Sequence, residues 1–130
     1  MQKSKLDILF ISIIFFSQAV YAGCGGCKAD RSKTVQIKSD VELVSNIGEN
    51  GMIEGNVLAS CGMCHFDVKT KDCSLYIRID DTPYAVKGSS IDDHGDSHAE
   101  DGFCNTVRTA SVKGKVKGDF FFAASFELNN

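Results

Sequence analysis

The sequence predicts a mainly β protein: a small five-stranded OB-like barrel with one short helix before the fourth strand. Three observations support this prediction. Apolar and polar residues alternate in several short segments, which is the period of a half-buried strand. Turn-forming residues divide these segments into hairpins. The order along the chain, three strands, a short helix and two further strands, is that of an OB-fold barrel.

The expected strands begin at Met52 and cover residues 53–57, 75–79, 84–86, 112–116 and 120–128. In the second strand, Leu75, Ile77 and Ile79 alternate with polar or amphipathic neighbours. Residues 80–83 (Asp-Asp-Thr-Pro) and 117–119 (Lys-Gly-Asp) are typical turn sequences, so each predicts a hairpin. The aromatic run 120–122 is expected to pack in the core.

The one helix is expected between residues 89 and 110. Residues at helical spacing in this segment are Phe103, Cys104, Val107 and Ala110, and Asp101 is a candidate N-cap. Gly55 and Gly114 fall inside strand patterns, where glycine fits the bends of a tightly coiled small barrel.

The first 22 residues are typical of a secretory signal peptide. Two lysines precede the apolar run 8–16, which is shorter than the roughly 20 residues that span a bilayer. Val20 and Ala22 supply the small residues of a cleavage site before Gly23. We therefore expect export to the periplasm or the extracellular space.

After cleavage, residues 23–51 are expected to form a flexible lead-in that contains Cys and Gly, and residues 52–130 the barrel domain. The small residues before Cys24 resemble the lipobox of bacterial lipoproteins. A lipid anchor at Cys24 is therefore the less favoured alternative. No membrane span is expected.

The composition narrows the functions further. The 130-residue chain has 14 basic and 17 acidic side chains, a formal net charge of -3 and six cysteines. Domains dedicated to nucleic acids carry a basic surface, so we expect no nucleic-acid partner. Six cysteines in so short an exported chain indicate either disulfides or a metal site.

Cysteines and histidines gather in two segments of the expected barrel. Cys61 and Cys64 form a CxxC pair, whose spacing lets two sulfurs meet one ion. His94 and His98 follow at a spacing of four residues, and Cys104 can add a ligand or replace a histidine. Thiolates and imidazoles suit Zn²⁺ or Cu⁺, so the sequence predicts a transition-metal site without catalysis.

Two other functions remain open at this stage. The cysteines can instead form disulfides that stabilise a structural or binding module without metal. Beside the metal site itself, we expect a structural disulfide between Cys73 and Cys104, which leaves Cys61 and Cys64 for the ion. In the second alternative, the CxxC pair carries out thiol–disulfide exchange. An enzyme is not expected, because the chain has no GxSxG, P-loop or Rossmann glycine motif.

Three strings carry a family resemblance. They are Cys61-Gly-Met-Cys-His-Phe, Cys73-Ser-Leu-Tyr-Ile-Arg-Ile-Asp and Ile91-Asp-Asp-His-Gly-Asp-Ser-His-Ala-Glu-Asp-Gly-Phe-Cys-Asn. Over about residues 53–128 the chain resembles the DUF6370 family of small exported bacterial proteins. The resemblance implies export and a compact barrel, and it supplies no activity. It also argues against His65 as an essential ligand, because the family pattern often has Gln there.

We expect the exported form to begin at Gly23, because signal peptidase accepts small residues at the positions of Val20 and Ala22. An intact-mass measurement of the exported protein tests this expectation. A mature chain that begins at a lipid-modified Cys24 would contradict it.

Overall fold

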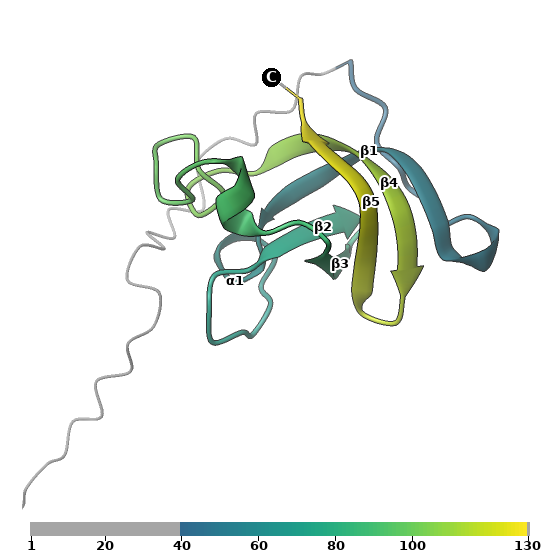
Figure 1. The fold of residues 1–130 in the computed structure, drawn as a ribbon, viewed down its shortest axis with the longest axis horizontal. Coiled ribbons are helices and arrows are strands. Elements are labelled where there is room, and N and C mark those ends of the chain that lie inside the picture. Colours follow the sequence, from purple (N-terminus) through teal and green to yellow (C-terminus); the bar gives the residue numbers. More distant parts are fainter. Residues whose placement is uncertain (1–39, 130) are drawn as a thin grey trace, which may run out of the picture.

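Five strands close into a barrel in the computed structural model, which describes residues 40–129 (Figure 1). The strands are β1 Met52–Cys61, β2 Leu75–Ile79, β3 Thr82–Lys87, β4 Arg108–Lys117 and β5 Phe120–Leu128. Their order around the barrel is β1-β2-β3-β5-β4, and β4 closes it by pairing with β1. Only β3 and β5 run parallel. The predicted fold class, a mainly β five-stranded OB-like barrel, is confirmed.

Both expected hairpins are present. Ile79 pairs with Thr82 across the first turn, where Asp80 adopts the left-handed conformation with a φ of 53°. Lys117 pairs with Phe120 across the second turn. The expected signal peptide and the greater part of the expected lead-in lie outside the described residues.

Helical structure within residues 40–129 is confined to short segments. The one α-helix, α1 (Gly62–His65), follows β1, and two 3-10 helices are η1 (Glu49–Gly51) and η2 (Ile91–His94). The helical element before the fourth strand is therefore η2. None of these helices is long and apolar enough to cross a membrane.

The helix expected from the spacing of residues 103–110 is wrong. Residues from Arg108 onward belong to β4, and Ala110 pairs with Val57 of β1. Phe103 and Cys104 are buried, as their apolar character predicts, but they reach the core from a loop. Hydrogen bonding to β1 therefore overrides a helical spacing that rested on few residues.

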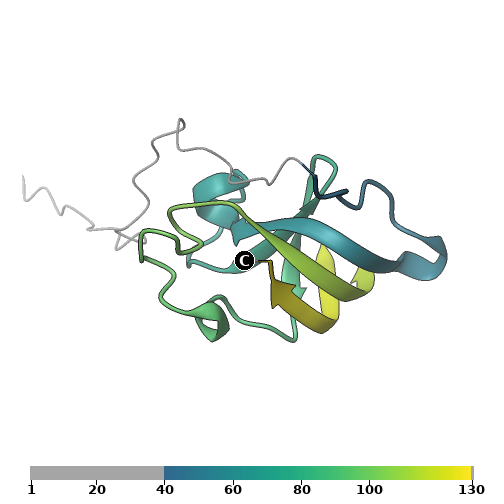
Figure 2. The same ribbon diagram turned by 90° about the horizontal axis from the view of Figure 1, so that it is seen from above.

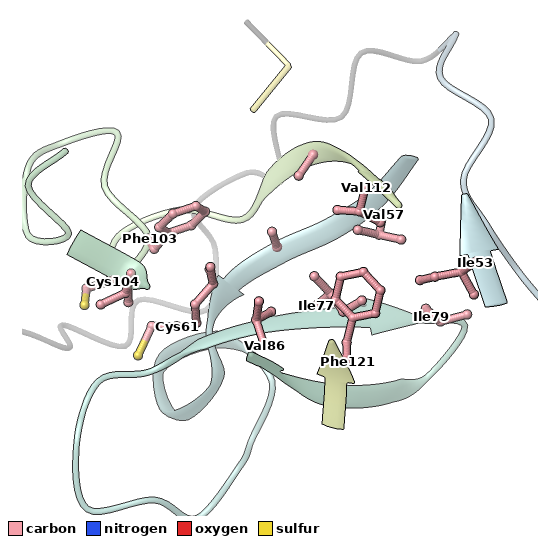
Figure 3. Packing of buried hydrophobic residues seen from close by; sticks show 14 residues of the cluster. Ile53, Val57, Cys61, Ile77, Ile79, Val86, Phe103, Cys104, Val112 and Phe121 are labelled. Atoms are coloured by element: carbon pink, nitrogen blue, oxygen red, sulfur yellow. The ribbon is translucent and has the colours of Figure 1, made fainter. Parts of the chain in front are cut away.

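The core runs along the inside of the barrel. Figure 3 shows Cys61 and Cys104 at one end of the buried cluster and Ile53 at the other. Ile77 and Phe121, both fully buried, fill the space between them. The two thiols therefore lie at a dry end of the barrel, closed by the segment that precedes β4.

The aromatic run on β5 divides between core and surface. Phe121 is fully buried, whereas Phe120 and Phe122 point outward because successive side chains of a strand lie on opposite faces. The expectation that the whole run packs in the core is therefore wrong for two of its three residues.

The last residues before the barrel lie against β1. Leu43 forms a parallel bridge with Asn56, and the backbone N of Val44 donates to the carbonyl of Asn56 at 2.8 Å. Gly55, with a φ of 144°, lies so close that a Cβ there would be 2.8 Å from the Val44 side chain. Glycine at this position therefore lets the preceding segment pack on the barrel.

Replacing Gly114 with Ala should lower the free energy of unfolding by about 1–3 kcal/mol, the usual cost of overpacking. A Cβ at this position would meet the carbonyl O of Phe122 and lie 2.6 Å from the ring of Phe121. Urea unfolding under reducing conditions measures the change. Ser111→Ala, at an exposed position of the same strand, is the control and should shift stability by less than about 0.5 kcal/mol. Equal stability of the two variants would show that the space beside Gly114 accommodates a Cβ, and would contradict the prediction.

Candidate metal centre

Four cysteine sulfurs gather at one end of the barrel. The Sγ atoms of Cys61, Cys64, Cys73 and Cys104 all lie within 4.8 Å of one another. The sulfurs of Cys73 and Cys104 are 3.5 Å apart. In a tetrahedral zinc site with Zn–S bonds of about 2.3 Å, neighbouring sulfurs are about 3.8 Å apart. The four sulfurs are therefore close enough together to be candidate ligands of one ion.

The end of β1 and the helix α1 position the first two sulfurs. Cys61 is the last residue of β1 and Cys64 lies three residues later in α1, so one helical turn brings both sulfurs to the same side. Between them, Gly62 is covered by the ring of Tyr76, which leaves no room for a Cβ. The backbone N of Gly62 donates to the carbonyl of Ser74 at 3.1 Å. This bond holds Cys73, the residue before Ser74, close to α1.

The segment before β4 positions the fourth sulfur. The backbone N of Cys104 donates to the carbonyl of Ser97 at 2.9 Å. Gly102 packs so closely on the Ser97 carbonyl that any side chain there would collide with it. The carbonyl of Phe103 accepts from the backbone N of Cys61 at 3.1 Å, which joins this segment to β1. Figures 1 and 2 both show the segment on the same side of the barrel as α1, away from the β4–β5 turn.

Burial decides the protonation of this cluster. The pKa of the Cys104 thiol is raised to about 11, mainly by desolvation and also by the neighbouring Cys61 and the charge of Asp92, while a hydrogen bond with Ser97 opposes the rise. Without a cation, Cys104 is therefore a neutral thiol at neutral pH. A bound metal reverses this preference, because its positive charge favours the thiolate.

His65 supports the cluster through the backbone. Its Nε2 lies 3.2 Å from the carbonyl O of Cys104. Because a carbonyl only accepts, Nε2 carries the hydrogen in this bond. Burial lowers the pKa of His65, so the ring is neutral at neutral pH. This geometry gives His65 a positioning role.

Three of the five predicted ligands, Cys61, Cys64 and Cys104, lie together, and Cys73 joins them. The sequence predicts instead that Cys73 forms a disulfide with Cys104. Those two sulfurs are in contact, but 3.5 Å exceeds the roughly 2.0 Å of a disulfide, and Cys104 is a free thiol. The signal that identifies Cys73 is its sequence position, directly before a strand that pairs with the strand ending at Cys61.

The two predicted histidine ligands lie outside this group of sulfurs. The His94 ring packs on Phe126 and Phe103, with centroids 4.9 and 5.9 Å away, and its Nε2 lies 2.7 Å from Ser89 Oγ. His98 has half of its side chain exposed, next to the carboxylate of Asp96. The geometry therefore brings four cysteine sulfurs together, and it gives the histidines other contacts.

The protein-family comparison gives one match. The model described as "Family of unknown function (DUF6370)" matches residues 55–129, a range that contains all four clustered cysteines. Comparisons with curated proteins and with solved structures found no match.

The reduced, metal-free protein should lose stability as the pH rises from about 9 to about 11. Over this interval the folded state keeps the Cys104 proton, whereas the unfolded chain, with a cysteine pKa near its ordinary value of 9.0, has released it. Ionisation of this thiol therefore lowers the free energy of the unfolded state relative to the folded state as pH rises, so the protein becomes less stable.

Urea unfolding under a chelator and a reductant, repeated across this pH range, measures the effect. Other groups also titrate there, so the comparison is with Cys104→Ser, whose stability should fall less steeply with pH. Parallel pH profiles for parent and variant would contradict the prediction.

Proposed function

The chain belongs to the DUF6370 family, whose function is unknown, and we propose that it is an exported, non-catalytic domain that binds one transition-metal ion. The ligands in this proposal are the thiolates of Cys61, Cys64, Cys73 and Cys104. The observation that carries it is the approach of these four sulfurs to within 4.8 Å of one another.

The way the sulfurs converge supports a site more than ordinary core packing. They come from three separate parts of the chain: the end of β1 with α1, the loop before β2, and the loop before β4. Cys61 and Cys104 are only 0% and 2% exposed, whereas Cys64 and Cys73 are half-buried. A lone buried cysteine behaves as a small apolar side chain. Four facing sulfurs instead form the Cys₄ donor set of closed zinc sites.

The number of ligands favours Zn²⁺ over Cu⁺. Both ions bind soft thiolates, but four-coordinate tetrahedral geometry is the rule for structural zinc. The 3.5 Å contact between the sulfurs of Cys73 and Cys104 is close to the edge of such a tetrahedron. Zn²⁺ is therefore the first choice in this proposal and Cu⁺ the second.

The same sulfurs support a second candidate, a disulfide-stapled domain without metal. The close approach of the four sulfurs is compatible with this candidate as well. A thiol–disulfide enzyme is less well supported. In thioredoxin-like enzymes the CxxC pair belongs to a βαβ unit, whereas Cys61 and Cys64 lie between the antiparallel strands β1 and β2.

The reduced full chain should bind one Zn²⁺ per molecule in competition with a chromophoric chelator. Cys73→Ser and Cys104→Ser should each weaken binding by more than about 100-fold, beyond the effect of losing a hydrogen-bond partner of a ligand. The matched control is the double variant His94→Ala, His98→Ala, which should bind as tightly as the parent. Affinity should fall with decreasing pH, because protons compete for the thiolates.

Two outcomes would contradict the four-cysteine site. Protein isolated without free thiols or metal, which also fails to bind either ion after reduction, would establish the disulfide-stapled domain. Loss of binding in the histidine variant, with Cys73→Ser unaffected, would instead restore His94 and His98 as ligands. Circular dichroism of each variant separates lost ligands from lost folding.

A further inference from the structure

Two exposed phenylalanines mark the outer face of β5. Phe120 is 42% exposed and Phe122 is 45% exposed, and their ring centroids lie 6.5 Å apart. The residue between them, Phe121, is fully buried, so the strand places one ring in the core and two in solvent. Adjacent exposed aromatic rings are a feature of interaction surfaces.

Lysines surround these two rings. The Nζ atom of Lys87 lies 5.0 Å from the ring centroid of Phe120, and that of Lys117 lies 5.7 Å from the ring centroid of Phe122. Lys115 pairs directly with Phe122 across the β4–β5 ladder. We call these five residues, Lys87, Lys115, Lys117, Phe120 and Phe122, the basic-aromatic surface. They form it on a chain whose formal net charge is -3.

The surface extends across four strands of the barrel. In the strand registers, Met52 of β1 pairs with Lys115, Lys115 with Phe122, and Phe122 with Lys87. Met52 is itself 47% exposed, so the row alternates apolar and cationic groups. Asp119 in the β4–β5 turn, next to Phe120, adds one negative charge beside the three lysines, and Glu54 of β1 is paired with Lys113.

A groove of about 320 Å³ opens beside Phe120. Its lining includes the hydroxyl-bearing residues Ser74, Tyr76, Ser89 and Ser90, together with Lys87. Hydroxyl and ammonium groups are the donors that bind a phosphate. The groove therefore brings the Lys87 ammonium and hydroxyl-bearing residues to the border of the surface, although the Ser89 hydroxyl already contacts His94 Nε2.

We propose that the basic-aromatic surface binds the anionic face of a phospholipid bilayer. The lysines contact lipid phosphates, Phe120 and Phe122 enter the interface, and one phosphate occupies the groove. Aromatic rings and basic side chains on one face are the combination that holds peripheral proteins in this plane. At Phe120 and Phe122 the β5 backbone is paired with both β3 and β4, so this part of the strand offers no free edge for adding a peptide strand.

The expected affinity is modest. Each lysine near an anionic membrane contributes about a fivefold gain in binding, so three contribute about 100-fold together. Such binding is reversible and weakens with salt, because the charges are exposed and screened.

Co-sedimentation of the full chain with vesicles tests the proposal. The vesicles are phosphatidylcholine alone or an equal mixture of phosphatidylcholine and phosphatidylglycerol. The apolar run 8–16 binds both kinds of vesicle through uncharged contacts. Taking the ratio of the two apparent affinities cancels this contribution. The triple variant Lys87→Ala, Lys115→Ala, Lys117→Ala should lower this ratio by about 100-fold.

The aromatic arm of the test uses Phe120→Ser, Phe122→Ser. This variant should weaken binding to the mixed vesicles by about tenfold or more, since each ring loses its partial burial in the interface. The matched control is Lys69→Ala, Lys71→Ala, which removes two exposed lysines from the loop before β2 and should leave the ratio unchanged. Unaltered circular dichroism and Zn²⁺ stoichiometry show that each variant is folded.

Several outcomes would overturn the membrane proposal. Equal ratios for the parent and the triple variant would do so, as would binding that salt leaves unaffected. Complete competition by millimolar inorganic phosphate would identify a free-anion site instead. A parent dimer that Phe120→Ser, Phe122→Ser converts to a monomer, without vesicle binding in either, would assign the surface to self-association.

Discussion

The attachment of the segment before β4 to the end of β1 is the constraint on which the cysteine cluster depends. The carbonyl of Phe103 accepts from the backbone N of Cys61, and the buried hydroxyl of Ser60 lies 2.7 Å from the same oxygen and 2.9 Å from the carbonyl of Thr106. One hydroxyl has a single proton, so Ser60 donates to one of these oxygens at a time. These contacts place Cys104 beside Cys61. Loss of them would leave the buried Ser60 hydroxyl without a partner, which would lower the stability of the folded state.

Desolvation then determines what the cluster can do. Thiols that are removed from water and placed beside one another resist ionisation, as the raised pKa of Cys104 shows. A cluster of this kind is poorly suited to nucleophilic attack at neutral pH. It becomes a strong donor set once a cation supplies the missing charge. This response to a cation is the physical basis of the proposed metal-binding role.

The strand alternation that builds the core also builds the outer face of β5. Phe121 fills the barrel, and its two neighbours are displayed to solvent beside lysines of β3 and β4. The sulfur cluster thus lies at one end of β1, while Met52, which pairs with Lys115 of the basic-aromatic surface, lies at the other end. A barrel can carry both features, because interior and exterior residues alternate along each of its strands.

The sequence by itself determined the five strands, both hairpins and the concentration of cysteines, because alternation and turn residues act locally. It also predicted three of the four clustered sulfurs. The tertiary structure alone decided that Cys73 joins them and that His94 packs on aromatic rings, since both depend on contacts between segments distant in the chain. The helix expected over residues 103–110 failed for the same reason: β4 gains its hydrogen bonds from β1, which no local pattern reveals.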